Sequence, residues 1–110
     1  MSTPLKLVDF KETLTSVATA TWTRLLTAND RDHILMYWDG TNTIRVYYKG
    51  NNDTVPTLAT DGVQYDTNFK GEFWDRGAVP VTEVWVYQAT GGNINIWARE
   101  GFASEQDRSR

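Results

Sequence analysis

The sequence predicts an all-β protein: a single antiparallel β-sandwich, jelly-roll-like, with an N-terminal arm and a polar C-terminal tail. Residues that favour strands, such as Thr, Val, Ile, Tyr and Trp, are frequent, and no long segment repeats apolar residues at helical spacing. Turn-forming residues recur at intervals of roughly ten residues, which is typical of sandwiches and barrels. A chain of 110 residues with 40% apolar residues fits one small folded domain.

Five segments read as strands, and two weaker ones follow from the same pattern. The five are residues 18–26, 32–38, 43–49, 83–89 and 93–99, and the weaker ones are 62–69 and a segment involving 72–74. Pro56 and Pro80 have no backbone N–H, so we expect them in loops, at strand starts or at sheet edges.

Residues 32–38 are apolar on both sides of the predicted strand. Ile34, Met36 and Trp38 share one side, and Leu35 and Tyr37 share the other. This pattern is typical of a central strand that is covered on both faces. In a chain of this size, a partner subunit is one source of the second cover.

The segments at 83–89 and 93–99 read as two strands of one hairpin. A three-residue loop, Thr90-Gly91-Gly92, keeps the β-branched residues on one face, because glycine supplies the positive φ that such loops need. Those residues are Val84, Val86, Ile94 and Ile96.

The same register gathers three aromatic side chains on the second face of that hairpin. It places Trp85 directly opposite Trp97, with Tyr87 beside them. Two interpretations stay open. A loop or the N-terminal segment covers the rings, or the rings form a contact surface for another protein or a sugar.

The two ends of the chain differ from the middle. Residues 1–15 carry apolar residues in a mixed pattern and are expected as an edge strand, a short helix or an arm that packs on a partner. Residues 16–103 are assigned to the sandwich, and residues 104–110 to a polar tail.

Composition excludes several classes of function. The net charge of −3 argues against a broad nucleic-acid surface. With no cysteine there is no disulfide framework, and one histidine excludes a site that needs two imidazoles. No secretory signal and no window of about 20 apolar residues is present, so we expect no membrane partner and synthesis in a cytoplasm.

No catalytic, metal or cofactor site is predicted. His33 has no nucleophile and orienting group to accompany it, and it reads as a residue at a strand end. The polar clusters at 29–32 and 51–53 do not match a calcium loop and read as turns. Four carboxylates are candidates for glycoside hydrolysis, but nothing in their spacing selects a pair: Asp61, Asp66, Glu72 and Asp75.

Several stretches from about Val17 to Gly101 resemble small β-sandwich proteins of tailed-bacteriophage virions, above all capsid decoration (cement or head-stabilising) proteins. They are Leu25 with Ala28-Asn29-Asp30-Arg31, the strand at 34–38, Ile44-Arg45-Val46-Tyr47, Asp61-Gly62, Phe73-Trp74, Gly77-Ala78-Val79-Pro80-Val81 before 84–87, Gly91-Gly92, and Ile94-Asn95-Ile96 with Glu100-Gly101.

The resemblance implies a virion protein without a catalytic site, located on the capsid exterior after synthesis in the host bacterium. Such proteins bridge major capsid subunits, stabilise the shell and assemble as dimers or trimers. We expect partner-binding residues on the N-terminal segment and the aromatic faces: Leu5, Leu7, Val8, Phe10, Trp85, Tyr87 and Trp97.

Two alternatives accompany this hypothesis. In the first, the chain is a carbohydrate-binding or receptor-binding module of a phage tail or fibre, with Trp85 and Trp97 as the stacking platform. The second is an enzyme, which would need two converging carboxylates in a pocket.

Overall fold

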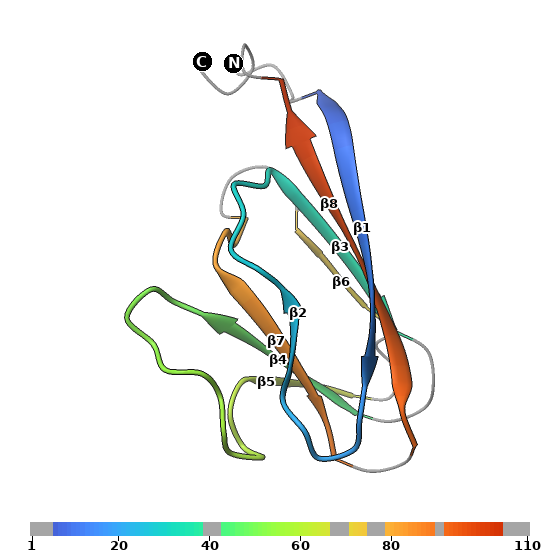
Figure 1. The fold of residues 1–110 in the computed structure, drawn as a ribbon, viewed down its shortest axis with the longest axis vertical. Helices are drawn as coiled ribbons and strands as arrows, with labels where there is room; N and C mark the ends of the chain where they lie inside the picture. The colour runs from blue at the N-terminus through green and yellow to red at the C-terminus, as the bar shows by residue number, and fades with distance from the viewer. Residues whose placement is uncertain (1–5, 39–42, 67–70, 75–78, 90–91, 105–110) are drawn as a thin grey trace.

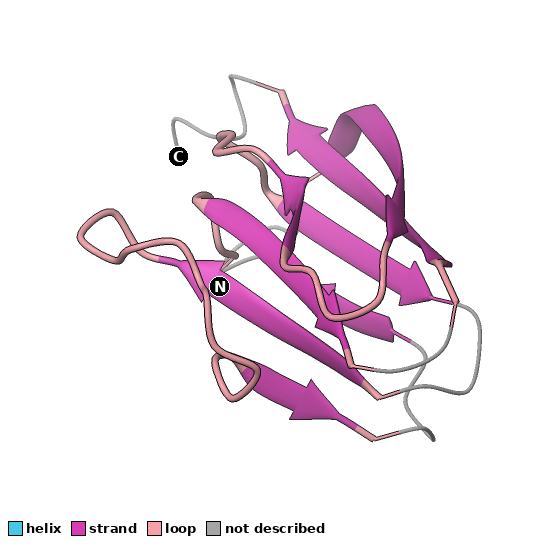
Figure 2. Ribbon diagram, turned by 60° about the horizontal axis from the view of Figure 1, so that its bottom comes forward, coloured by secondary structure: helices cyan, strands magenta, loops and turns pink. Residues whose placement is uncertain are grey.

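In the described part of the chain, eight strands form two four-stranded sheets that face each other (Figures 1 and 2). The computed structural model describes residues 6–38, 43–66, 71–74, 79–89 and 92–104, with no helix among them. The strands are β1 (Leu7–Val17), β2 (Thr23–Leu26), β3 (His33–Trp38), β4 (Ile44–Lys49), β5 (Val63–Tyr65), β6 (Gly71–Trp74), β7 (Glu83–Gln88) and β8 (Ile94–Ala103).

Each sheet is antiparallel and mixes strands from both halves of the chain. The first has the order β1-β8-β3-β6, and the second has the order β2-β7-β4-β5. Alternate side chains of the central strands fill the space between the sheets. The most deeply buried apolar ones are Val17, Ile34, Met36, Trp38, Ile44, Val46, Val84, Val86 and Ile96.

The predicted all-β class and its two-layer arrangement are confirmed. The segments expected at 32–38, 43–49, 83–89 and 93–99 contain β3, β4, β7 and the first part of β8. The two weaker segments contain β5 and β6. As expected, β3 is a central strand, lying between β8 and β6.

The strand predicted over residues 18–26 is wrong in its first half. Only Thr23–Leu26 is strand, because Ala20 adopts a left-handed backbone with φ of 55°. The Ala20 N–H donates to the Gln88 carbonyl at 2.7 Å. This turn takes the chain from β1 in one sheet to β2 in the other.

The hairpin predicted from residues 83–99 is also wrong. Strand β7 pairs with β2 and β4, while β8 pairs with β1 and β3, so the two strands lie in different sheets. Their apolar sides still face one core, but from opposite layers. Thr90 and Gly91 of the expected loop lie outside the described residues.

The N-terminal segment adopts the edge-strand alternative. Leu7–Val17 pairs antiparallel with β8 along its length, and neither a helix nor a detached arm is present in those residues. The sandwich therefore begins at Leu7 instead of residue 16. Residues 1–5 and 105–110, which include Leu5 and most of the expected tail, lie outside the described part of the chain.

Candidate docking surface

The outward side of the β1-β8-β3 sheet carries five large apolar side chains that water reaches. These are Phe10, Leu14, Leu35, Tyr37 and Trp97, here called the outer apolar face. Their exposed fractions run from 40% for Trp97 to 59% for Leu14. They alternate with inward core residues such as Met36 and Ile96, so the strand period places them together.

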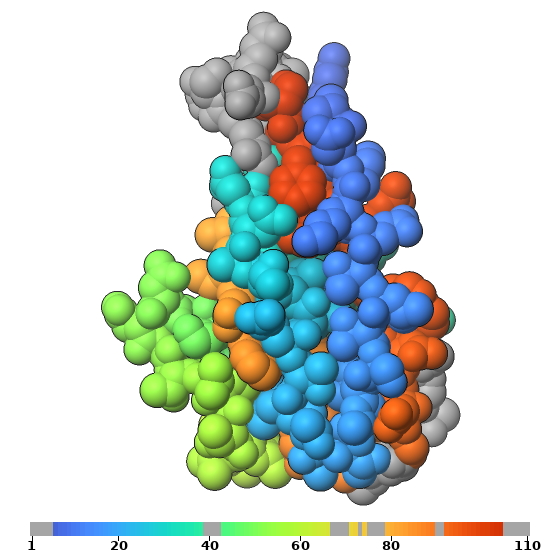
Figure 3. Space-filling view, viewed as in Figure 1, coloured from blue at the N-terminus to red at the C-terminus, as the bar shows by residue number. Residues whose placement is uncertain are grey.

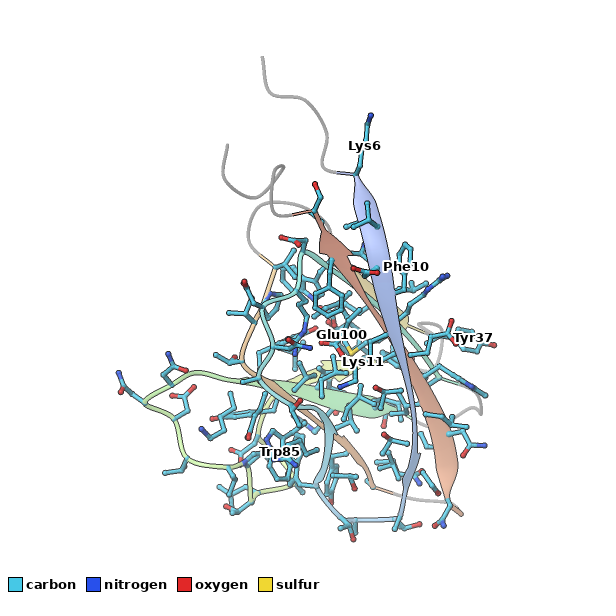
Figure 4. The ribbon with its side chains drawn as sticks, turned by 45° about the horizontal axis from the view of Figure 1, so that its top comes forward. Lys6, Phe10, Lys11, Tyr37, Trp85 and Glu100 are labelled. Atoms are coloured by element: carbon cyan, nitrogen blue, oxygen red, sulfur yellow. The ribbon has the colours of Figure 1, made fainter. Side chains whose placement is uncertain are left out.

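Strand register aligns this face in rows. Leu14, Trp97 and Tyr37 lie opposite one another on adjacent strands. The rings of Tyr37 and Trp97 are 5.7 Å apart between centroids and tilted by 39°. In Figure 4, Tyr37 projects away from the body of the sandwich. The rings are therefore neighbours on one open surface.

One basic and one acidic residue accompany the rings. The next row pairs Glu12 with Arg99 and Arg99 with Leu35. The Arg99 guanidinium lies 4.3 Å from the centre of the Phe10 ring, and its Nε is 3.7 Å from Glu12 Oε1. Both charged side chains are largely exposed, so this ion pair adds little stability.

A hollow of about 160 Å³ opens on this face. Its lining is Glu12, Leu35, Tyr37, Trp97, Ala98 and Arg99. The space is small for an organic substrate, since ligand pockets typically measure about 300–1,000 Å³. It suits a single protruding side chain or one sugar ring better than an enclosed substrate.

The outward face of the other sheet is covered differently. The Trp22 ring lies 5.1 Å from that of Tyr87 and 6.1 Å from that of Tyr47. Trp22 Nε1 donates to the Leu58 carbonyl at 3.0 Å, so the ring joins the sheet to the loop at residues 50–62. Figure 3 shows this loop, in green, projecting from the side of the molecule next to β7, in orange. Tyr87 is only 8% exposed as a result.

Polar contacts fix the conformation of that loop. Asp61 Oδ2 accepts hydrogen bonds from the N–H groups of Leu58 at 2.9 Å and Thr57 at 3.0 Å. These bonds lower the pKa of the Asp61 carboxyl below its usual value. Arg45 Nη1 donates to the carbonyls of Thr60 and Asp61 at 3.2 and 3.1 Å.

Trp85 also lies on this second sheet. Its Nε1 donates to Glu83 Oε1 at 3.1 Å, and Arg24 Nη1 lies 3.3 Å from Glu83 Oε2. The bond from Trp85, followed by that from Arg24, lowers the pKa of the Glu83 carboxyl. Trp85 is half-buried within this chain of contacts.

The structure therefore separates the predicted partner-binding residues. Trp97 and Phe10 lie on the outer apolar face, with Val8 exposed nearby on β1. Leu7 is half-buried, and Trp85 and Tyr87 belong to the opposite sheet. The platform that combined Trp85 with Trp97 is wrong, because the hairpin that would join them does not form.

Sequence reasoning missed Leu14 and two residues of β3 as parts of this surface. Leu35 and Tyr37 were expected under a second cover, for which a partner subunit is one source, and in the single chain they are 43% and 51% exposed. Their alternation with buried Ile34 and Met36 was the available signal.

The pairing of β1 also limits how binding can be tested. A deletion of residues 2–12 would not leave the sandwich intact. Because Leu7 and Asp9–Glu12 pair with β8, the deletion would strip half of an edge strand from the sheet. Point substitutions on the outer apolar face are the sharper test.

The polar clusters make contacts that are typical of turns. Asp53 Oδ2 accepts the Gly50 N–H at 2.8 Å, and Asn29 Oδ1 accepts the Asp30 N–H at 3.0 Å. Asp32 differs, because its Oδ2 accepts the N–H of the distant Ala103 at 2.8 Å. Among the described residues, no three His, Cys, Asp or Glu side chains are grouped to hold a metal ion.

In the described part of the chain, no long apolar helix is present that would cross a membrane. Scans of family models, curated proteins and solved structures found nothing that matches this chain.

Proposed function

We propose that this protein is a non-enzymatic structural component of a phage virion that binds the outer surface of the capsid shell and bridges major capsid subunits. Two observations support the proposal: the family resemblance of residues 17–101 and the outer apolar face on the β1-β8-β3 sheet. The face is the main support, because it is a contact surface that no loop among the described residues covers.

The fold in this proposal is a jelly roll. An eight-stranded jelly roll divides its strands between two sheets, and capsid and lectin domains are among its members. Here the first sheet interleaves strands 1, 8, 3 and 6, and the second interleaves 2, 7, 4 and 5. Each sheet thus mixes early and late strands, as nested Greek keys require.

The chemistry of the face favours a protein partner. Exposed aromatic rings with an arginine among them are typical of the centres of protein interfaces. Removing one such ring from water contributes roughly 1.5–3 kcal/mol. A shell presents the same surface many times. A protein that contacts several shell subunits at once therefore binds tightly overall, even when each single contact is modest.

The charge of the chain fits a place outside the shell. With a net charge of −3, the protein gains nothing from contact with packaged DNA. A complementary partner surface would offer an apolar recess to the rings of Tyr37 and Trp97 and a basic residue to Glu12.

Density maps of virions with and without this protein would test the proposal. The expected result is an additional sandwich-shaped density on the shell exterior, contacting at least two capsid subunits through the β1-β8-β3 side. Density inside the shell, at the tail only, or absent altogether would contradict it.

A second candidate function rests on the hollow beside Tyr37 and Trp97. Adjacent aromatic rings stack on sugar rings, and Glu12 and Arg99 in the same lining offer hydrogen bonds to hydroxyl groups. A glycan array with the wild type and Trp97→Ala would test it. Sugar binding that the substitution removes would favour the carbohydrate-binding alternative, and no binding by the wild type would exclude it.

A further inference from the structure

Within the described ranges, β1 pairs on one side only, with β8, and its other edge differs from the other edges of the sandwich. The strands at sheet edges are β1, β6, β2 and β5, with 11, 4, 4 and 3 residues. Natural sandwiches keep edge strands short or protect them with charges and bulges, because an exposed edge pairs readily with another strand. β1 has a register shift between Leu7 and Asp9, but its pairing with β8 is regular from Asp9 to Val17. Figure 1 shows β1 as a long strand beside β8, starting near the upper end of the sandwich. It is therefore the edge best able to accept another strand.

From this edge we propose that two copies of the chain pair β1 with β1, antiparallel, around a two-fold axis through Phe10. The proposal concerns a second copy of this chain and does not rest on binding to a shell. The paired sheets would run continuously from β6 of one copy to β6 of the other.

Symmetry limits the register of such a pair. The axis must be perpendicular to the sheet, so each outward residue lies opposite an outward residue of the other copy. The axis then passes through one residue position of the strand. In β1, the side chains of Phe10, Glu12 and Leu14 point outward. Arg99 and Trp97, which lie opposite Glu12 and Leu14 on β8, point outward as well.

The charges of β1 select the register. Axes through Asp9, Lys11 or Glu12 put two identical charges directly opposite each other. An axis through Thr13 places Lys11 and Asp9 opposite uncharged residues of the other copy. An axis through Phe10 places Asp9 opposite the partner's Lys11 on both sides.

The apolar contact agrees with that register. The two Phe10 rings would lie side by side on the outward face, where Phe10 is 48% exposed in the single chain. Asp9 and Lys11 are exposed in the single chain, so both are available to a second copy. The two-fold would also bring two outer apolar faces onto the same side of one sheet.

Charge reversal at the two selected positions tests this pairing in the full chain. Sedimentation equilibrium would compare the wild type with Asp9→Lys and Lys11→Asp, each checked for folding by its thermal transition. Either single change replaces two attractive pairs by two repulsive ones, so we expect the dimer to dissociate about tenfold more readily. An equimolar mixture of the two variants restores opposite charges at both pairs and should dimerise like the wild type.

The mixture separates specific pairing from net charge or misfolding. Recovery in the mixture with weak self-association of each variant supports the register. A wild type that is monomeric at every concentration would overturn the proposal. So would an oligomer that ignores both substitutions, or a mixture that stays monomeric.

Discussion

Arg31 and Glu100 form an ion pair inside the sandwich, with Arg31 Nε 2.6 Å from Glu100 Oε2 and side chains that are 0% and 2% exposed. Arg31 also donates to the carbonyls of Thr27, Pro80 and Thr82. The guanidinium thereby links β8 to the segment after β2 and to the segment before β7. Glu100 follows Arg99 in β8, so one strand carries this buried anchor and part of the outer apolar face.

Substituting Glu100 by Gln should lower the free energy of unfolding by about 3 kcal/mol. The change leaves the buried Arg31 charge without a counter-charge, and breaking one side of a buried pair is costly. Urea denaturation followed by tryptophan fluorescence would measure the loss. An unchanged unfolding midpoint would show that Arg31 does not need this carboxylate.

The matched control is Glu83→Gln. Glu83 pairs with Arg24 near the surface, where the Arg24 side chain is 49% exposed. Solvent and salt weaken such a pair, so the variant should unfold close to the wild type. A loss as large as that of Glu100→Gln would contradict the role of burial.

Substituting Trp22 by Ala should release the loop at residues 50–62. The variant loses the hydrogen bond to the Leu58 carbonyl and the ring contacts with Tyr47 and Tyr87. Limited proteolysis should cut the loop faster at Val55 or Leu58 than in the wild type, while the rest of the chain stays protected. Equal cleavage rates would show that the loop is held without the ring.

Alkaline pH should destabilise the protein through the tyrosines between the sheets. Trp74 Nε1 donates to the Tyr48 hydroxyl at 2.7 Å, and Tyr65 donates to Glu72. Burial, followed by hydrogen bonding to Glu72, raises the pKa of the Tyr48 and Tyr65 hydroxyls above the usual 10.0.

The sign of this pH effect follows from the protons bound. Above pH 10.0 the unfolded chain loses these phenolic protons while the folded chain retains them. Stability is therefore fully present below pH 10.0 and falls as the pH rises further. Unfolding curves from pH 8 to 11 should show this fall, and Tyr48→Phe should make it shallower. A stability independent of pH over that range would contradict the prediction.

Most strands follow from sequence alternation, but their sheet partners do not. Val84 and Val86 alternate with aromatic residues. Ile94 and Ile96 alternate with polar residues and Trp97. This two-residue period is the same whether the strands form a hairpin or lie in two facing sheets. The two arrangements differ in pairing: β7 pairs with β2 and β4, while β8 pairs with β1 and β3. No short-range pattern near the 83–99 segment carries that information.

The candidate site was also predictable only in part from the sequence. Trp97 and Phe10 were identified as contact residues from unpartnered apolar character, and both are exposed. Tyr87 has the same sequence pattern, but Trp22 covers it from a distant position in the chain. A long-range contact of that kind leaves no local signal. The sequence around Arg31 is typical of a turn and gives no sign that this side chain is buried.

Binding to purified shells that lack this protein tests the central claim most directly. Co-sedimentation would compare the wild type with Trp97→Ser and Tyr37→Ser, and with Leu58→Ser, which changes a 61% exposed residue on the loop of the other sheet. Loss of the outer rings should weaken shell binding at least tenfold with little change in the unfolding midpoint, while Leu58→Ser binds like the wild type. Equal binding by all four proteins, or no binding by the wild type, would contradict a docking role for the outer apolar face.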